Sequence, residues 1–355
     1  MRQSIVPPYL LRQLASSADP AMARAAAAAQ SSLARDDSFR SVRWGPGVDH
    51  TAAPTARARA IEPPVRTIFD AENTETLPGT TVRSEGDADT GDISVTEAHD
   101  GFGFTHALFA EAFGRASIDD DNLPLLGTVH YGEDYDNAFW DGQRMVFGDG
   151  DGTVFTRFTA SLSVIGHELA HGVTQYTANL AYEGQSGALN ESVSDVFGAL
   201  VEQHSRGQSA ADASWLIGEG LFTDRVQGDA LRSMKAPGTA YDDDMLGKDP
   251  QPDSMDGYVD TTDDNGGVHL NSGIPNRAFY LTAVAIGGNA WEAAGQIWYD
   301  TLTGGDIAPT CDFATFATLT ADAASLRYGD GSAEHTAVVE AWQTVGVTES
   351  ATMAG

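Results

Sequence analysis

The chain has 355 residues, of which 41% are hydrophobic, and a formal net charge of −31 from 51 acidic and 20 basic residues. This length and apolar fraction are typical of a globular protein with about two domains, whereas the charge disfavours binding to nucleic acid or anionic membranes. No run of about eighteen apolar residues predicts a membrane helix. The single cysteine, Cys311, excludes an intramolecular disulfide and a zinc site built from thiolates.

Residues 1–50 form a first unit, which we interpret as a pro-segment. Its start lacks the continuous apolar core of a secretory signal, because Pro7 and Pro8 interrupt it. We therefore expect a protein that is cytoplasmic or leaves the cell by a non-classical route. The prolines predict an extended stretch over SIVPPYLL, and ADPAMARAAAAAQSSLARDD predicts a helix. Residues 51–64 are rich in proline and alanine and predict an exposed linker that proteases can cut.

Residues 65–160 predict a β-rich domain. Short alternating segments such as RTIFDAE and LPGTTVRSEG are separated by Gly, Asn and Asp, which is typical of an antiparallel sheet. One interruption, EAHDGFGFTHALFAEAFG, predicts a helix. Residues 161–347 change to a period of about 3.6 and predict a helical domain, and residues 348–355 form a tail. The expected fold class is α+β.

The motif HELAH, residues 167–171, predicts a metal site at the junction of these two domains. Positions i and i+4 share one face of a helix, so His167 and His171 can both bind one ion. Catalytic zinc needs a third protein ligand, which we assign to Glu191 in the next predicted helix. Asp195, one turn further on, is expected to accept the spare N–H of a ligand histidine. Glu168 is expected to act as general base on a zinc-activated water. The alternative is a surface helix that carries these side chains by chance.

The stretch VIGHELAHGVTQYTANLAYEGQSGALNESVSDVFG resembles the zinc-binding core of the thermolysin family of neutral metallopeptidases. DNAFWDGQRMVFGDGDG, LRSM and DNGGVHLNSGIPNRAFYL resemble the family in the same order, so that the similarity runs from about residue 100 to 347. PPYLL and RTIFDAENTETLPGTTVRSEG resemble the protealysin-like branch, which has a short pro-segment. The resemblance implies a zinc endopeptidase with a thermolysin-like two-domain fold, in which the zinc-site helix joins the β-rich and helical domains.

Carried over by position, the resemblance implies three further catalytic residues. His269 would hydrogen-bond the developing oxyanion, and Asp264 would orient its ring. Tyr182 would be a second donor to the same oxygen, and such a pair lowers the barrier by several kcal/mol. From the residues alone, His269 is read as a turn histidine and Tyr182 as a core aromatic.

The resemblance also implies substrate-binding residues. Asn137 and the backbone of Ala138 would hold the substrate as an added strand, and Arg232 would bind the carbonyl beyond the scissile bond. The pocket on the leaving-group side would be apolar, which implies cleavage on the amino side of bulky hydrophobic residues. Its members, each of which alone is equally well a core residue, are Phe155, Phe158, Val164, Ile217, Leu221 and Leu231.

The chain departs from the family at its double calcium site. Glu202 and Glu219 are acidic at the matching positions, but Ser163, Ser214 and Leu216 are not. Two carboxylates are too few for a hard cation that prefers six to eight oxygen ligands.

A second family calcium loop is matched in part by Thr223 and Asp229, with Phe222 in place of a tyrosine. We therefore expect zinc as the cofactor and calcium to be weakly bound or absent.

The expected partners are peptide or protein substrates and the chain's own pro-segment. Pro7, Pro8 and Tyr9 are expected to dock near the cleft and block it until the linker is cut; a disordered cap is the alternative. A proteinaceous inhibitor is a further candidate partner. Nucleic acid and membranes are not expected partners.

Two other functions compete with an endopeptidase. A zinc aminopeptidase would need a site for a free amino terminus, and no glycine-methionine-glutamate-asparagine element is present upstream. A catalytically dead binding protein would be expected to lose its base or its oxyanion histidine, whereas Glu168, Tyr182 and His269 are all present.

Overall fold

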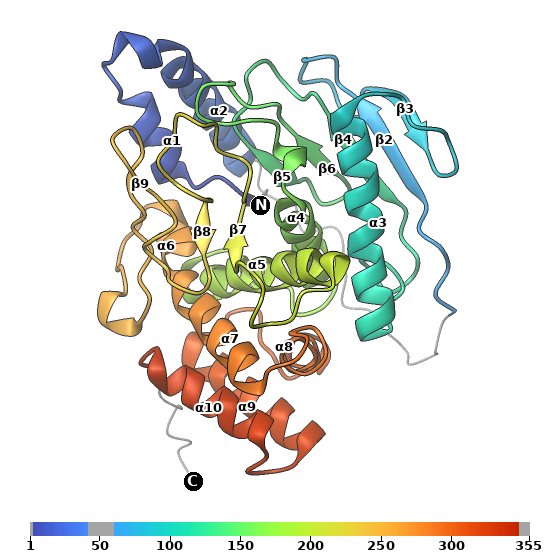
Figure 1. Cartoon of the computed structure of the whole chain (residues 1–355), viewed down its shortest axis with the longest axis vertical. Coiled ribbons are helices and arrows are strands. Elements are labelled where there is room, and N and C mark those ends of the chain that lie inside the picture. Colours follow the sequence, from blue (N-terminus) through green and yellow to red (C-terminus); the bar gives the residue numbers. More distant parts are fainter. Residues whose placement is uncertain (1–2, 42–59, 348–355) are drawn as a thin grey trace.

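The computed structural model describes residues 3–41 and 60–347 (Figure 1). A small N-terminal unit covers one end of a β-rich half, and a helical half lies on the other side of two central helices (Figure 1). The α+β fold class expected from the sequence is thereby confirmed. Residues 51–59 of the predicted linker and the tail at 348–355 lie outside the described residues.

The N-terminal unit is a short strand followed by a helical hairpin. The predicted extended stretch is wrong beyond Pro7, because helix α1 begins at Pro8. Proline is favoured in the first turn of a helix, where its missing N–H has no partner to lose, and α1 buries Leu10, Leu11 and Leu14. The elements are β1 (Gln3–Ser4), α1 (Pro8–Ala15), the 3₁₀ turn η1 (Pro20–Met22) and α2 (Ala23–Ser41).

The β-rich half contains a six-stranded sheet in the order β1-β5-β6-β4-β2-β3. The prediction of a purely antiparallel sheet is wrong, since β2 pairs with β4, and β4 with β6, in parallel. Helix α3 (Ile93–Phe113) connects β3 to β4 and provides the long crossover that a parallel return requires. The strands after β1 are β2 (Arg66–Asp70), β3 (Thr80–Ser84), β4 (Leu125–Val129), β5 (Ala138–Trp140) and β6 (Met145–Phe147).

The helical half confirms the predicted period of 3.6 and adds one unexpected helix. Helix α6 (Asp264–Asn271) begins in a kink, because Asn265, Gly266 and Gly267 have φ of 51°, 86° and 73°. The sequence analysis did not predict this helix, because its glycines indicated a turn. The regular helices are α4 (Leu162–Gln175), α5 (Gly184–Arg206), α7 (Gly273–Ile286), α8 (Ala294–Thr303), α9 (Phe313–Tyr328) and α10 (Ala333–Thr344).

Short elements connect these helices. Two-stranded ribbons are formed by β7 (Leu216–Ile217) with β8 (Arg232–Ser233), and by β9 (Asp242–Asp243) with β10 (Gly247–Lys248). The 3₁₀ turns η2 and η3 span Phe158–Ala160 and Met255–Gly257. No helix within the described ranges is long and apolar enough to cross a membrane.

Helices α4 and α5 lie at the centre of the molecule and pack closely against each other (Figure 1). Two glycines permit the approach. A Cβ atom on Gly166 would lie 3.0 Å from Gly198 Cα, and one on Gly198 would lie 2.4 Å from the Ser163 carbonyl oxygen. Because no side chain separates the helices at this point, polar residues of α4 and α5 face each other in the interior.

Candidate active site

Three buried side chains from α4 and α5 converge on one point. His167 and His171 come from α4, and Glu191 comes from α5. The Nε2 atoms of the two histidines each lie 3.5 Å from an oxygen of the Glu191 carboxylate. Within the described ranges this is the only cluster of three or more His, Cys, Asp or Glu ligand atoms that lie within 4.8 Å of one another.

The donor atoms of this cluster fit a divalent cation such as zinc. His167 Nδ1 lies 2.8 Å from Asp195 Oδ1, and His171 Nδ1 lies 2.8 Å from Asn190 Oδ1. Both Nδ1 atoms therefore carry a proton, which leaves the lone pairs on Nε2. Those Nε2 atoms and Glu191 Oε2 are buried without a hydrogen-bond partner among the described residues. Unpartnered buried polar atoms are costly, and a cation bound between them would satisfy all three.

Asp195 connects the histidine cluster to two further polar side chains. It accepts hydrogen bonds from Arg232 Nε and Nη2 at 2.9 and 2.8 Å and from Asn276 Nδ2 at 2.8 Å. Burial acts to raise the pKa of Asp195, but the Arg232 charge and the bond to His167 hold that pKa well below its usual range. Asp195 therefore stays ionised and can hold the ring of His167 in one orientation.

Burial also keeps His171 in the form that can bind a metal. It lowers the pKa of His171 to about 3, so the ring is neutral. Asn190, which orients this ring, was missed by the sequence analysis. Its own Nδ2 donates to the Leu180 carbonyl at 3.0 Å, which turns Oδ1 toward His171. A lone asparagine beside Glu191 carries no sequence signal for such a role.

Glu168 is fully buried where α4 meets strand β5. The Trp140 backbone N–H donates to Glu168 Oε2 at 2.9 Å, while Oε1 has no partner among the described residues. Burial and the nearby Glu191 carboxylate raise the pKa of Glu168. The arrangement fixes one oxygen and leaves the other free to exchange a proton.

His269, Asp264 and Tyr182 come together beside Glu191. His269 Nδ1 lies 2.8 Å from Asp264 Oδ1, and His269 Nε2 lies 3.3 Å from the Tyr182 hydroxyl and 3.6 Å from Glu191 Oε2. Burial acts to lower the pKa of His269, but Asp264 and Glu191 raise it, which favours a ring that donates from both nitrogens. Gln251, which donates to the His269 carbonyl at 2.7 Å, was missed by the sequence analysis.

The N-terminal strand β1 lies along the site as an added antiparallel strand on β5. Beyond it, the Ile5 N–H donates to the Ala138 carbonyl at 3.2 Å, and the Val6 N–H donates to Asn137 Oδ1 at 2.9 Å. Asn137 Nδ2 in turn donates to the Val6 carbonyl at 3.4 Å. Asn137 and Ala138 thus bind the protein's own main chain at Ile5 and Val6.

Two charged or polar side chains hold the carbonyls of the same segment. Arg232 Nη1 donates to the Ile5 carbonyl at 3.0 Å, and His269 Nε2 lies 3.0 Å from the Ser4 carbonyl oxygen. Ile5 and Val6 are fully buried in the main apolar core of the molecule, which also contains the six expected pocket residues: Phe155, Phe158, Val164, Ile217, Leu221 and Leu231.

Pro7, Pro8 and Tyr9 follow directly and are mostly buried. Burial raises the pKa of the Tyr9 phenol, which faces Tyr241 and Asp249. The residues that contact the catalytic side chains are Ser4, Ile5 and Val6, which the sequence analysis did not single out.

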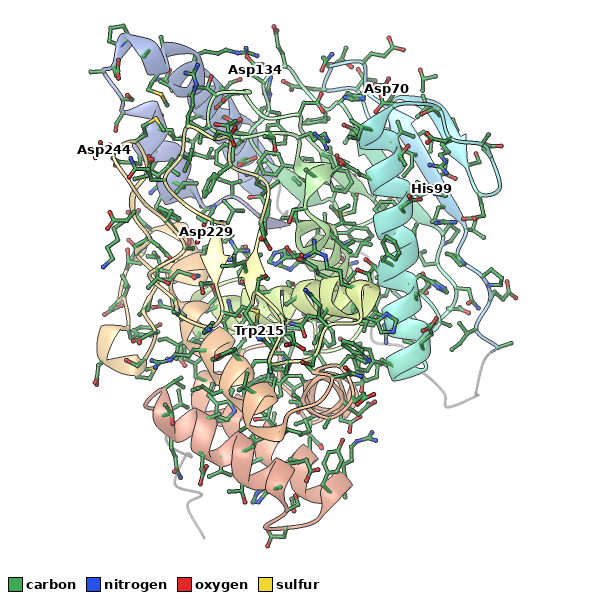
Figure 2. The ribbon with its side chains drawn as sticks, in the orientation of Figure 1. Asp70, His99, Asp134, Trp215, Asp229 and Asp244 are labelled. Atoms are coloured by element: carbon green, nitrogen blue, oxygen red, sulfur yellow. The ribbon has the colours of Figure 1, made fainter. Side chains whose placement is uncertain are left out.

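The residues matched to calcium sites have other partners. Glu202 pairs with Arg206, and Ser163 Oγ accepts from the Gly218 N–H at 3.1 Å. The Thr223 hydroxyl donates to the Thr153 carbonyl, and Asp229 lies exposed in the loop that precedes β8 (Figure 2).

Comparison with known proteins places the chain among metallopeptidases. Residues 54–175 match the family description "Thermolysin metallopeptidase, catalytic domain", and residues 178–347 match "Thermolysin metallopeptidase, alpha-helical domain". An extracellular metalloprotease of Pectobacterium carotovorum subsp. carotovorum is 49% identical over 344 residues, which is 97% of this chain and 96% of that protein. Protease PrtS of Photorhabdus sp. (strain Az29) is 51% identical over 284 residues, 79% of this chain and 76% of that protein.

A solved structure extends the similarity to the whole fold. The precursor of protealysin, a metalloproteinase from Serratia proteamaculans, is 50% identical and superposes with a TM-score of 0.86 over 98% of this chain and 100% of that chain. The resemblance inferred from the sequence is confirmed by these matches. The chain belongs to the thermolysin family of zinc metalloendopeptidases, in its protealysin-like branch.

Proposed function

We propose that this metalloendopeptidase is made as a precursor whose residues 1–50 block the cleft, and that it cleaves on the amino side of bulky hydrophobic residues. The observation that carries the proposal is the convergence of His167, His171 and Glu191 beside Glu168, under a main chain bound like a substrate.

The roles we propose follow from the positions of these side chains. Bound zinc supplies a Lewis acid that polarises the attacking water and the scissile carbonyl. Glu168 takes the proton of the attacking water through its free oxygen and passes it to the leaving nitrogen. His269 and Tyr182 donate hydrogen bonds to the carbonyl oxygen as its charge develops, and Asp264 holds the ring of His269.

Specificity is proposed to come from the six apolar pocket residues, with Arg232, Asn137 and Ala138 holding the main chain. The chain's own Ile5 supports this assignment, since a bulky aliphatic side chain is fully buried where the residue after the scissile bond would lie. A buried aliphatic side chain contributes about 1.5–3 kcal/mol relative to an exposed one.

The inhibitory role of residues 1–50 is also supported by charge. Residues 1–50 contain six arginines and four aspartates, which give a formal net charge of +2. Because the whole chain has a net charge of −31, the other residues together carry −33. Arg24 pairs with Asp134 at 2.7 Å, and Arg35 pairs with Glu75 at 2.7 Å. Cutting the linker, residues 51–64, would release a cationic segment from an anionic catalytic unit, residues 65–160 and 161–347.

Two finer assignments remain proposals. The Pectobacterium relative is named an extracellular metalloprotease, and we propose that this chain also acts outside the cell by a non-classical route. We propose further that zinc is the only metal needed, because Arg206 neutralises Glu202 where a double calcium site would lie.

The proposal is tested by comparing the wild type with Glu168→Ala after limited trypsin has cut the linker. Zinc content and casein hydrolysis are measured for both. We expect equal zinc content and a loss of hydrolysis of about 10²–10⁴-fold in the variant. Equal hydrolysis by both proteins would contradict the proposed mechanism, and zinc binding without hydrolysis by either would favour a catalytically dead binding protein.

A further inference from the structure

We propose that the chain cleaves itself between Ser4 and Ile5, a site distinct from the linker, because that peptide bond lies in the reacting position of its own active site. The inference rests on the proposed function and names a particular substrate for it.

The register of the segment places one peptide bond among the catalytic side chains. The Ser4 carbonyl, on one side of the bond, receives a hydrogen bond from His269 at 3.0 Å. On the other side of the bond, the Ile5 N–H donates to Ala138 at 3.2 Å and also faces the Glu168 carboxylate.

The next residue positions confirm the direction of the chain. Arg232 donates a hydrogen bond to the Ile5 carbonyl. The N–H and the carbonyl of Val6 both hydrogen-bond the side-chain amide of Asn137. Upstream, Gln3 and Ser4 pair with Trp140 and Phe139 as an antiparallel strand. The segment therefore runs through the site with the Ser4 carbonyl at His269 and the Ile5 carbonyl at Arg232.

The side chains on the two sides of the bond suit cleavage. Ile5 is bulky, apolar and fully buried, as the leaving-group pocket requires, and it is not proline, so its backbone N–H can donate to the Ala138 carbonyl. Hydrolysis adds water across the bond: the water oxygen joins the Ser4 carbonyl carbon as the C–N bond breaks. One water proton passes through Glu168 to the Ile5 nitrogen as the bond breaks, and the second leaves the new carboxyl group for the same nitrogen, giving a Ser4 carboxylate and an Ile5 ammonium.

The two cleavage products differ in the contacts that hold them on the rest of the protein. Upstream of the bond, Gln3 and Ser4 are joined to the site by the short β1–β5 pairing. The rest of the segment keeps Val6, Leu10, Leu11 and Leu14 buried in the main apolar cluster. Cleavage is therefore expected to release the residues up to Ser4 and leave a precursor that begins at Ile5.

The test follows the intact mass of the full-length, zinc-loaded precursor over time. We expect the wild type to lose the residues up to Ser4 at a rate that does not depend on protein concentration, and Glu168→Ala to stay intact. Ile5→Asp should slow the trimming by at least about tenfold, because it places a charge in an apolar pocket. Ile5→Leu should be trimmed at a rate close to that of the wild type. Ile93→Asp, at a helix start that is 56% exposed, is the matched control and should have no effect.

A second measurement does not depend on catalysis. In the Glu168→Ala precursor, the amide hydrogens of Ile5 and Val6 should exchange slowly with solvent, and free exchange at both would overturn the assigned register.

The outcomes separate this inference from the proposed function. If trypsin-matured wild type hydrolyses casein but its precursor keeps residues 1–4, the self-cleavage is wrong and the proposed function stands. If Glu168→Ala is trimmed as fast as the wild type, another peptidase makes the cut and the inference is overturned. A trimming rate that rises with protein concentration would likewise overturn cleavage within one chain. If the wild type hydrolyses neither the Ser4–Ile5 bond nor casein, both proposals fail.

Discussion

Arg232 donates two hydrogen bonds to Asp195, at 2.9 and 2.8 Å, and the same carboxylate lies 2.8 Å from His167 Nδ1. One buried anion therefore holds both a histidine of the metal-site cluster and the arginine that binds the Ile5 carbonyl. We expect metal binding and substrate binding to be coupled through this residue.

Asp195→Asn is expected to weaken both functions. The amide can still accept from one partner, but it no longer neutralises Arg232 or strengthens the His167 ring as a ligand. We expect zinc affinity to fall about 10–100-fold, measured by competition with a chromophoric chelator. Asp229→Asn, at an exposed position, is the control and should leave the affinity unchanged. Equal affinity of wild type and Asp195→Asn would contradict the coupling.

Salt is expected to loosen the pro-segment. Arg12, Arg24 and Arg35 pair with acidic residues of the catalytic unit, and the Arg12–Asp263 pair is exposed at 3.8 Å. Exposed pairs contribute about 0–1 kcal/mol each and are screened by salt. With Glu168→Ala precursor nicked by trypsin, the fraction of pro-segment released on size exclusion should rise with sodium chloride. Release that falls with salt would show that apolar burial alone holds the segment.

His130 is expected to make stability depend on alkaline pH. It lies 2.8 Å from Asp149 and 3.0 Å from Asp92, which caps the start of α3. The hydrogen bond to Asp149 is the main cause that raises the pKa of His130 to about 9. Because the folded pKa exceeds the unfolded value of about 6.5, the stabilisation is complete below that pH and is lost as pH rises through about 9.

The size of this effect is reduced by partial solvent exposure, and we expect on the order of 1–3 kcal/mol. Thermal melts of Glu168→Ala with and without His130→Gln should differ clearly at pH 6 and converge near pH 10. A difference that is the same at both pH values would mean that the ionised pair contributes nothing.

Calcium is expected to have little effect on stability. A ligand present at about a thousand times its Kd stabilises a protein by about 4.1 kcal/mol, so a calcium site of micromolar affinity would raise the melting temperature visibly at millimolar calcium. We expect no such rise in metal-depleted buffer resupplied with zinc. A rise of several degrees would show that a calcium site exists despite the Arg206–Glu202 pair.

The sequence predicted the cluster of His167, His171 and Glu191 because helical spacing is regular. His167, Glu168 and His171 lie on one helix, and Glu191 and Asp195 lie on the next, as the sequence indicated. The glycine pair Gly166 and Gly198, which brings the two helices together, gave no such signal, because a glycine within a helix predicts a break more readily than a close contact.

The parts that were missed depend on contacts between distant segments. Ser4 lies 3.0 Å from His269 although 265 positions separate them, and no local pattern announces that pairing. Strands β2 and β4 pair in parallel because α3 carries the chain back between β3 and β4, and β4 and β6 pair in parallel with β5 between them in the chain, which alternation within a strand cannot reveal. The kink at Asn265–Gly267 likewise concealed helix α6, and His269 lies near the C-terminal end of that helix.

The central claim, a zinc ion between His167, His171 and Glu191, is tested most directly by anomalous diffraction at the zinc edge on crystals of the Glu168→Ala precursor. We predict one strong peak about 2.0–2.2 Å from both Nε2 atoms and from a Glu191 oxygen. Zinc-loaded crystals with no peak at this position would contradict the account.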